Sequence, residues 1–397
     1  MRILHTVEFY APNVGGAQEV VRQISERLVE RNHVVKVATT RLPERAGSTM
    51  NGVRIEEFDI SGNAVRGFRG ETGRYQDFLR TGTFDIIMNY AAQQWATDLA
   101  FPILDHLACP KILAPCGFSS LFNPAYASYF AHLPSVMRRY DQLIFHSDSY
   151  RDIQYARQRR LSHYTVIPNG AAESEFGKID SSFRSRYGIP DDVPLLLTVG
   201  SHTGIKGHSL VINAFRRARI GRAVLVIVGN STGGGGCSLD CRGRARITEL
   251  LSFGRKQIML LNPPRPDVVA AYHAADLFVF GSNIECSPLV LFEAMASKTP
   301  FVTVACGNAE EIAKWSGGGH VISTEHRPDG SAGATPDAMA RAIEHLILSP
   351  DERARLGLAG YGAWRREFSW EKIVARYEQL YQTLIDRTPA GRKASLS

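Results

Sequence analysis

The chain of 397 residues lacks any apolar run of the roughly 20 residues that a helix needs to cross a bilayer. Its opening apolar stretch is cut short by Glu8, so residues 2–7 predict a first strand rather than a signal peptide. The composition, 44% hydrophobic and 21% charged, is typical of a globular protein that folds in water. We therefore expect a cytoplasmic protein, and its length predicts two domains.

Cysteine is scarce: there are six in the chain, and only Cys237 and Cys241 lie close together in the sequence. They form a C-x3-C pair directly after the glycines at 233–236. A zinc site ordinarily needs a second pair of ligands, and neither a second pair nor a histidine accompanies these cysteines in the sequence. We predict free thiols here, with neither a metal nor a disulfide.

Acidic residues are outnumbered by basic ones, which gives a net charge of +7. No nucleic-acid-binding module is recognisable and aromatic residues do not interleave with the basic ones, so we expect no nucleic-acid partner. The arginines cluster at residues 138–139, 157–160, 216–222 and 242–246. Two interpretations stay open, namely solvated helix faces and a peripheral patch on a membrane surface.

Strand-like and helix-like segments alternate along the chain in two series. The first series has expected strands at 2–7, 34–39, 53–58, 85–90, 111–114, 142–146 and 164–167. The second has expected strands at 194–199, 223–228, 257–261, 277–280, 300–304 and 320–322. Such alternation predicts parallel sheets covered by helices on both faces. The expected fold class is α/β, with two doubly wound, Rossmann-like domains that face each other across a ligand-binding cleft.

The turn signal Pro168-Asn169-Gly170 ends the first series. We expect an N-terminal domain over 1–170, a linker over 171–190 and a C-terminal domain over 191–365. A C-terminal helix over 366–386 should pack back on the N-terminal domain through its aromatic residues, and residues 387–397 should be disordered.

The segment from residue 284 to residue 296 carries Glu285 and Glu293, eight residues apart. A buried strand should precede it, and an apolar helix should begin with Ser287 as the N-cap and Pro288 as the first helical residue. Glu285 should then lie in the loop at the carboxyl end of a strand, with Glu293 about a turn and a half into the helix.

The start of this expected helix is suited to an anionic ligand. The backbone N–H groups of Leu289 and Val290 have no partner within the helix and should attract phosphate. Carboxylates on both sides of a phosphate site suit a diphosphate with hydroxyl-bearing groups at both ends. A nucleotide-sugar is such a ligand.

Five short motifs occur in order along the chain, each in an expected strand–loop–helix setting. They are Asn13-Val14-Gly15-Gly16-Ala17, Pro168-Asn169-Gly170, Val199-Gly200 through Lys206-Gly207, Glu285 with Glu293, and Gly307-Asn308-Ala309-Glu310-Glu311-Ile312. Together they resemble the motifs of glycosyltransferase family 4, the retaining nucleotide-sugar enzymes of GT-B fold. The spacing of the two glutamates, E-x7-E, is the most specific match, and the resemblance covers essentially the whole chain.

The resemblance implies a retaining hexosyltransferase that moves a hexose-type sugar from a nucleoside-diphosphate sugar to a glycan or lipid-linked acceptor, as in cell-surface polysaccharide synthesis. Lys206 and Glu285 are the expected catalytic residues. Lys206 would stabilise the departing diphosphate, Glu285 would bind hydroxyls of the donor sugar, and Glu293 would bind the ribose. The expected donor-binding residues are Gly15, Gly16, Gly200, Ser201, Lys206, Glu285, Ser287, Leu289, Val290 and Glu293.

Each of these roles has an ordinary structural alternative. Lys206 can be a surface lysine, and Glu293 a helix-surface carboxylate, although its apolar neighbours predict burial and therefore a partner. Gly15 and Gly16 can form a plain strand–helix turn. The two glutamates of the last motif can act as helix-capping charges.

The acceptor site should be built from loops of the first half, including Gly15, Gly16 and residues 89–94 and 116–123, with Cys116 and Gly117 on the acceptor side. Two positions depart from the family pattern. Ser201 stands where an arginine is usual, and Cys116 where a histidine is usual. A thiol does not replace imidazole as a proton carrier at neutral pH unless its pKa is shifted, but in retaining transfer the leaving phosphate itself can accept the proton. Family acceptors are often lipid-linked, so association with the inner face of the membrane is expected.

No DxD-type motif with a flanking apolar strand is present, and Asp191-Asp192 lies in an expected turn. The resemblance implies that no metal or other cofactor is needed. Two alternatives remain: a nucleotide-sugar 2-epimerase of the same fold, and a non-catalytic nucleotide-sugar-binding scaffold, which Ser201 and Cys116 favour.

Overall fold

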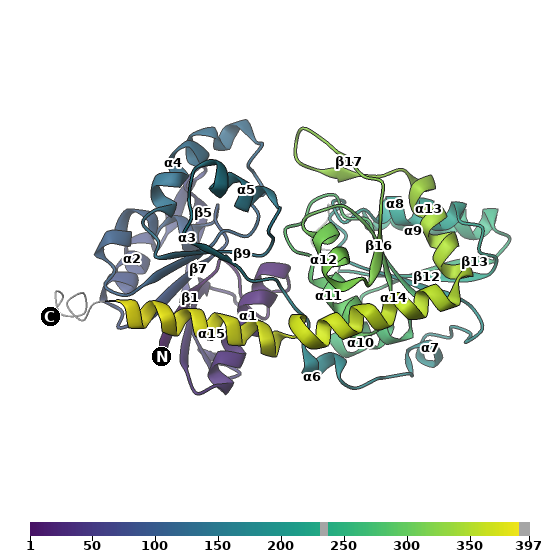
Figure 1. Cartoon of the computed structure of the whole chain (residues 1–397), viewed down its shortest axis with the longest axis horizontal. Helices are drawn as coiled ribbons and strands as arrows, with labels where there is room; N and C mark the ends of the chain where they lie inside the picture. Colours follow the sequence, from purple (N-terminus) through teal and green to yellow (C-terminus); the bar gives the residue numbers. More distant parts are fainter. Residues whose placement is uncertain (231–236, 389–397) are drawn as a thin grey trace. The chain divides into compact units, whose positions relative to one another are not determined.

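The computed structural model describes residues 1–230 and 237–388, which form two compact α/β units (Figure 1). Unit 1 consists of Met1–Asn169 together with the segment from Trp370 onward, and unit 2 is Gly170–Ser369. Within the described ranges, no helix has the length and apolar character needed to cross a membrane. The predicted disordered tail lies outside the described residues except for its first two positions, and so do the glycines that precede Cys237.

Unit 1 is built on an eight-stranded sheet in the order β10-β9-β8-β7-β1-β2-β4-β3. Its strands are β1 (Arg2–Thr6), β2 (Val34–Thr40), β3 (Thr49–Met50), β4 (Val53–Phe58), β7 (Ile86–Tyr90), β8 (Lys111–Ala114), β9 (Gln142–Phe145) and β10 (Tyr164–Val166). The pairing of β3 with β4 is antiparallel, and the other pairings are parallel. The seven strands predicted for the first half are confirmed to within a residue or two.

The short antiparallel strands of this unit were not predicted. Besides β3, they are β5 (Ile60–Asn63) and β6 (Gly67–Gly70), which form a separate hairpin. Three of its residues, Gly62, Gly67 and Gly70, have positive φ angles. Glycine-rich strands of this length carry no apolar alternation that sequence reasoning can detect.

Helices cover the sheet of unit 1, and the last helix of the chain is one of them. They are α1 (Gly16–Glu30), α2 (Thr72–Thr81), α3 (Trp95–Asp98), α4 (Ala127–Met137), α5 (Arg151–Gln158) and α15 (Trp370–Arg387). Tyr381 of α15 is fully buried, and its hydroxyl lies 3.0 Å from Nε2 of His5 on β1. Arg27 of α1 pairs with Glu371 of α15 at 2.9 Å. Residues 376 positions apart in the sequence thus pack in one core.

Unit 2 is built on a six-stranded parallel sheet in the order β13-β12-β11-β14-β15-β16. Its strands are β11 (Leu195–Val199), β12 (Ala223–Val228), β13 (Lys256–Leu261), β14 (Leu277–Phe280), β15 (Phe301–Val304) and β16 (Gly319–Ile322), with a short antiparallel pair β17 (Glu325–His326) and β18 (Ala332–Gly333) apart from the sheet. All six predicted strands of the second half are confirmed. The short pair was not predicted.

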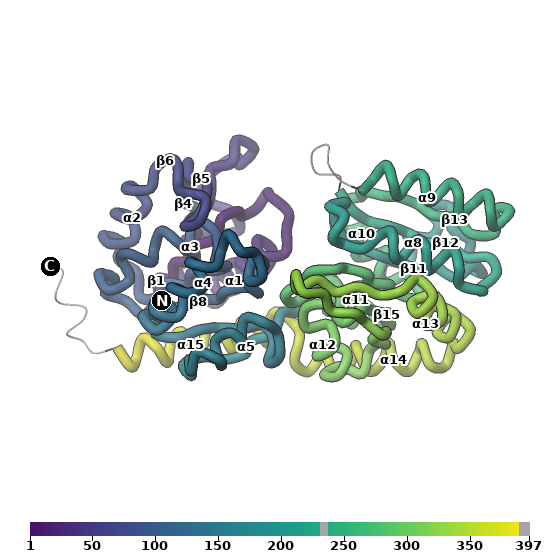
Figure 2. Tube along the Cα trace, turned by 90° about the horizontal axis from the view of Figure 1, so that it is seen from above, coloured from purple at the N-terminus to yellow at the C-terminus, as the bar shows by residue number. Residues whose placement is uncertain are grey.

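Helices lie on both faces of the unit 2 sheet, so alternate residues of each strand enter different cores. They are α6 (Glu173–Phe176), α7 (Phe183–Arg186), α8 (His208–Arg217), α9 (Ser238–Leu251), α10 (Arg265–Ala274), α11 (Leu289–Ala296), α12 (Ala309–Ser316), α13 (Pro336–Leu348) and α14 (Pro350–Ala363). Along β12, Val226 packs with residues of α10, α11 and α12, whereas Leu225 packs with residues of α8, α9 and α13. Figure 2 shows α8 and α9 side by side, as their contacts require. This double coverage is the reason the strands are almost wholly apolar.

Candidate functional site

The sheet of unit 2 has a point where the chain changes direction, between β11 and β14. From β11 the chain moves outward through β12 to β13, and it then returns to place β14 on the other side of β11. In sheets of this kind, the loops that leave the carboxyl ends of the two central strands diverge and form the ligand site. The loops after β11 and β14 are therefore the expected site, and they carry Lys206 and Glu285.

Lys206 and Glu285 lie in direct contact. The Nζ of Lys206 is 2.6 Å from Oε1 of Glu285, and the Ser282 hydroxyl donates to the same oxygen at 2.8 Å. The backbone N–H of Asn283 also donates to the carbonyl of Ile205 at 2.8 Å. The two loops are thus joined by backbone and side chain, and they hold one cation and one carboxylate at the carboxyl edge of the sheet.

A glycine makes this close approach of the loops possible. Gly207 has φ +69°, and a Cβ built on it would lie 1.7 Å from the carbonyl oxygen of Gly281 at the end of β14. No side chain fits in that space. The glycine after Lys206 in the motif therefore has a structural cause, which is backbone-to-backbone packing at the start of α8.

Glu293 lies in α11, where it is 8% exposed, and its expected partner is present. Nη2 of Arg265 is 2.6 Å from Oε1 of Glu293 and 2.6 Å from Oε2 of Glu175. Sequence reasoning predicted that a buried Glu293 needs a partner but did not find Arg265. The available signal was weak, namely an arginine at the start of the helix that follows β13.

The predicted start of α11 is wrong by one residue. Pro288 is the N-cap with φ −70° and ψ 112°, and the helix begins at Leu289. The extended ψ of Pro288 keeps it outside the helix, so Ser287 lies one position before the cap, with 8% of its surface exposed. The N–H groups of Leu289 and Val290 remain the first two of the helix, as the sequence argument requires.

The loop after β15 also reaches Glu285. Gly307 has φ +63°, and a Cβ on it would lie 3.0 Å from Cβ of Glu285. The N–H of Asn308 donates to the carbonyl of Cys286 at 3.0 Å. The fifth motif therefore supports the loop that carries Glu285, while Glu310 and Glu311 lie in the first turn of α12.

Within unit 2, Gly200 and Ser201 directly follow β11, in the loop that continues to Lys206. The N–H of Gly200 donates to the carbonyl of Val228 at 2.9 Å, which keeps the loop beside the end of β12. The structure thus gathers the unit 2 candidates on the loops and helix starts at one end of the sheet.

The other candidates belong to unit 1. Gly15 is the N-cap of α1 in extended conformation, and Gly16 opens the helix. A Cβ on Gly16 would meet nothing within 4 Å, and one on Gly15 would meet only the flexible side chain of Gln18. Backbone conformation and packing within the unit therefore do not explain this pair of glycines.

The loop that carries Cys116 and Gly117 has an unusual backbone. Cys116, Gly117 and Phe118 have φ of +58°, +94° and +48° in succession. The N–H of Gly117 donates to Oδ2 of Asp152 at 2.9 Å, and burial raises the pKa of that carboxyl to about 6. Consecutive residues in the left-handed region cost conformational energy, and such strained residues cluster at active sites and ligand-binding loops.

A histidine near Cys116 was missed by the sequence argument. Sγ of Cys116 is 3.8 Å from the hydroxyl of Tyr90, which is 2.9 Å from Nε2 of His146. Nδ1 of His146 faces the carbonyl of Ile167 at 2.9 Å and must carry the proton, so Nε2 accepts from Tyr90. Burial lowers the pKa of His146, which keeps the ring neutral.

Part of the expected acceptor loop is internal. Asn89 is fully buried, and its amide donates to Thr6 Oγ1 at 2.7 Å and accepts from Tyr140 at 2.9 Å. Gln94 is also buried, 6% exposed. Asn89 and Gln94, the two ends of the 89–94 segment, are therefore part of the interior of unit 1, where their polar groups are hydrogen-bonded.

Two α/β units, each built on a mainly parallel sheet, are the architecture of the GT-B glycosyltransferase fold, and solved structures of that fold match this chain. Sucrose-phosphate synthase from Thermosynechococcus elongatus matches with a TM-score of 0.77 at 18% identity, over 97% of this chain and 99% of that one. The Anabaena protein HepE, solved with UDP and glucose, matches with a TM-score of 0.73 at 16% identity, over 97% and 100%.

Family models identify both halves. Residues 14–174 match the model "Glycosyltransferase Family 4", and residues 180–362 match "Glycosyl transferases group 1". The chain belongs to the family 4 glycosyltransferases of GT-B fold.

Curated relatives carry a glycosyltransferase name. D-inositol 3-phosphate glycosyltransferase from Xylanimonas cellulosilytica is 28% identical over 212 residues, 53% of this chain and 47% of the relative. The enzyme of that name from Kineococcus radiotolerans is 25% identical over 284 residues, 65% and 61%. The chain spans about half the length of the curated relatives it matches.

Proposed function

We propose that the chain is a retaining glycosyltransferase that moves a hexose-type sugar from a nucleoside-diphosphate sugar to a glycan or lipid-linked acceptor, in cell-surface polysaccharide synthesis. The observation that carries the proposal is the contact of Lys206 with Glu285 at the carboxyl ends of β11 and β14, where sheets of this type bind ligands. The relatives' names support sugar transfer, and the UDP in the HepE structure supports a nucleotide-sugar donor.

The roles of the unit 2 residues follow from their chemistry. Lys206 places an ammonium where the diphosphate leaves, and the N–H groups of Leu289 and Val290 add the positive end of a helix. Glu285 accepts hydrogen bonds from the donor sugar, and Glu293 from the ribose. Gly200 and Ser201 in the loop after β11, and Ser287 in the loop after β14, line the proposed donor site.

Donor binding also draws on unit 1 in this proposal. Gly15 and Gly16 offer backbone N–H groups without side chains, and their own packing gives no other reason for two glycines. The acceptor is held by the loop of Cys116 and Gly117. The leaving phosphate oxygen takes the proton of the acceptor hydroxyl, so no imidazole at position 116 and no metal ion at the diphosphate are required.

Membrane association in this proposal rests on exposed arginines of unit 1. Arg139 pairs with Asp105 at 2.9 Å and Arg157 with Asp148 at 2.6 Å, so these two arginines have carboxylate partners on the surface. Arg138 and Arg160 are exposed and remain as contacts to an anionic membrane on the cytoplasmic side.

The proposal is tested by following the donor alone. Many glycosyltransferases hydrolyse their donor slowly, so incubation with α-linked UDP-, GDP- and ADP-sugars should release a free hexose from one of them. Proton NMR of the first-formed sugar should show the α anomer, because a retaining enzyme transfers to water with the same configuration. A β anomer would exclude retention. Donor binding with no hydrolysis or transfer would support the scaffold alternative. Formation of the 2-epimeric sugar, either still attached to the nucleotide or released together with nucleoside diphosphate, would support the epimerase.

A further inference from the structure

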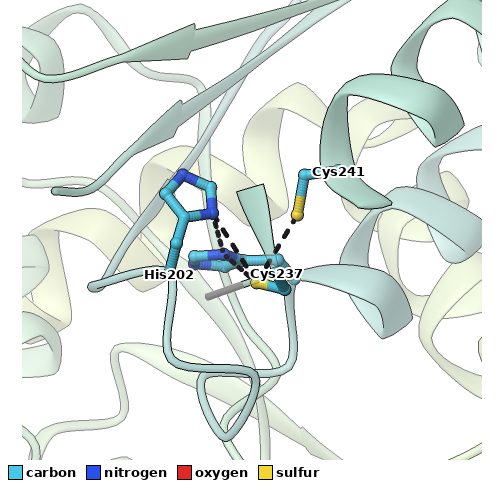
Figure 3. Close-up of side chains that lie close together, drawn as sticks. His202, Cys237 and Cys241 are labelled. Atoms are coloured by element: carbon cyan, nitrogen blue, oxygen red, sulfur yellow. Dashed lines mark hydrogen bonds between the residues drawn. The ribbon is translucent and has the colours of Figure 1, made fainter. Parts of the chain in front are cut away.

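Four potential metal ligands from separate segments of unit 2 converge on one point. His202 lies in the loop after β11, His208 is the first residue of α8, Cys237 is the N-cap of α9, and Cys241 lies in the first turns of α9. One ligand atom from each lies within 4.8 Å of every other. Figure 3 shows His202, Cys237 and Cys241 with their ring and sulfur atoms turned toward one another.

The distances between these atoms are those of a tetrahedral zinc site. With Zn–N of about 2.0–2.1 Å and Zn–S of about 2.3 Å, tetrahedral geometry places two nitrogens about 3.4 Å apart, nitrogen and sulfur about 3.6 Å and two sulfurs about 3.8 Å. The two Nδ1 atoms are 3.3 Å apart, Sγ of Cys237 is 3.6 Å and 3.7 Å from them, and the two sulfurs are 3.7 Å apart. Four of the six edges of the tetrahedron therefore agree to about 0.1 Å.

The chemistry of the four groups fits a soft cation better than it fits mutual hydrogen bonding. His202, His208 and Cys241 are 3%, 1% and 0% exposed. A hydrogen-bonded cluster satisfies only one N–H···N contact between the two rings, and thiols are weak donors. Imidazole nitrogens and thiolate sulfurs each offer a lone pair to such a cation.

We propose that His202, His208, Cys237 and Cys241 bind one Zn²⁺ in a structural Cys₂His₂ site. Two imidazole nitrogens and two thiolates form the ligand set, so binding releases the two thiol protons. Nitrogen and sulfur ligands favour Zn²⁺ over Mg²⁺ or Mn²⁺. Four protein ligands leave no position for a substrate, and the ion therefore organises the fold rather than the chemical step.

The ion would fix the loop that carries Lys206. His202 belongs to that loop, its N–H donates to the carbonyl of Asn230 at 3.0 Å, and its carbonyl accepts from the N–H of Cys237 at 3.1 Å. A metal at this point joins the loop after β11 to the starts of α8 and α9. This site does not depend on the proposed transferase activity.

The proposal departs from the sequence prediction of free thiols without a metal. The prediction of free thiols rested on the absence of a second ligand pair close to Cys237 and Cys241 in the sequence. The second pair is His202-x5-His208, in which His202 lies within the motif that ends at Gly207 and His208 directly follows it. Strand β12 separates this pair from the cysteines in the sequence, and the parallel sheet brings the two pairs together. The histidines were missed because they lie far from the cysteines in the sequence.

The test measures metal in the purified full-length chain. Elemental analysis by mass spectrometry should find about one zinc per chain. The Cys237→Ser/Cys241→Ser variant should bind zinc at least about 100-fold more weakly in competition with a chromophoric chelator. Cys109→Ser, which changes a thiol of unit 1, is the matched control and should retain the metal.

A second measurement covers the case in which the double variant fails to fold. Wild-type protein stripped by a chelator should lose melting temperature, and Zn²⁺ alone should restore it, because an ion that binds only the folded state stabilises that state. Co²⁺ in its place should show thiolate charge-transfer absorption. Wild type without zinc whose melting temperature Zn²⁺ does not change would overturn the proposal. Equal zinc affinity in the double variant and the wild type would also overturn it.

Discussion

Lys206→Ala should lower kcat by about 10²–10³-fold, since a preorganised positive charge at a leaving group typically contributes this much to the rate. Within residues 1–230 and 237–388, Lys206 is the only positively charged side chain that contacts Glu285, and the substitution removes it. The developing charge on the departing diphosphate then has no ammonium beside it. The effect should appear mainly in kcat, measured by release of nucleoside diphosphate under saturating donor.

Two variants separate this effect from general damage. Lys206→Arg keeps the charge in a different shape and should recover part of the lost rate, while Lys314→Ala removes an exposed lysine on α12 and should leave kcat within a factor of two. A Lys206→Ala enzyme that turns over within a factor of about three of wild type would show that the lysine serves only to neutralise Glu285.

Gly207→Ala should destabilise unit 2 by about 3 kcal/mol or more, the largest stability effect that we expect from a single methyl group in this chain. The new Cβ would lie 1.7 Å from the carbonyl oxygen of Gly281, so the start of α8 has to move away from the end of β14. That shift also displaces the neighbouring Lys206. Chemical denaturation should show a lower free energy of unfolding, and donor binding should weaken.

Gly204→Ala is the matched control for backbone strain. Gly204 has φ +83°, also in the left-handed region, but a Cβ there would meet nothing within 4 Å. Its replacement should cost only the conformational strain, about 1 kcal/mol. If both variants lose the same stability, the close contact of α8 with β14 is not what requires glycine at position 207.

The fold was predictable from the sequence because its strands are buried on both faces. Segments such as Ala223–Val228 are wholly apolar and bounded by polar or turn residues, and the predicted bounds of this strand match the observed ones. The short antiparallel pieces had no such signal. β17 and β18 are two residues each, and their pairing is set by the surrounding loops rather than by their own side chains.

The placement of Glu285 in a loop and Glu293 in a helix was predictable for a related reason. Both lie within one strand–loop–helix segment, so local periodicity fixes their elements. Arg265 and His146 were not predictable, since each meets its partner through contacts between distant parts of the chain. Ser201 and Cys116 stand where the family usually has an arginine and a histidine. Near Cys116, the structure places Tyr90 and, behind it, His146 from another strand–loop segment.

The central claim is that unit 2 binds a nucleoside diphosphate through Glu293 and its neighbours, and a thermal-shift titration tests it most directly. Wild type and Glu293→Ala are melted with UDP, GDP and ADP and with their common sugars. A ligand at about 100 times its Kd stabilises the folded state by about 2.7 kcal/mol, which is readily detected as a higher Tm. Arg265 keeps Glu175 as a partner in the variant, so the variant should still fold. The account predicts that one nucleotide raises the Tm of wild type and that Glu293→Ala loses most of this increase. No stabilisation by any nucleotide, or equal stabilisation of both proteins, would contradict it.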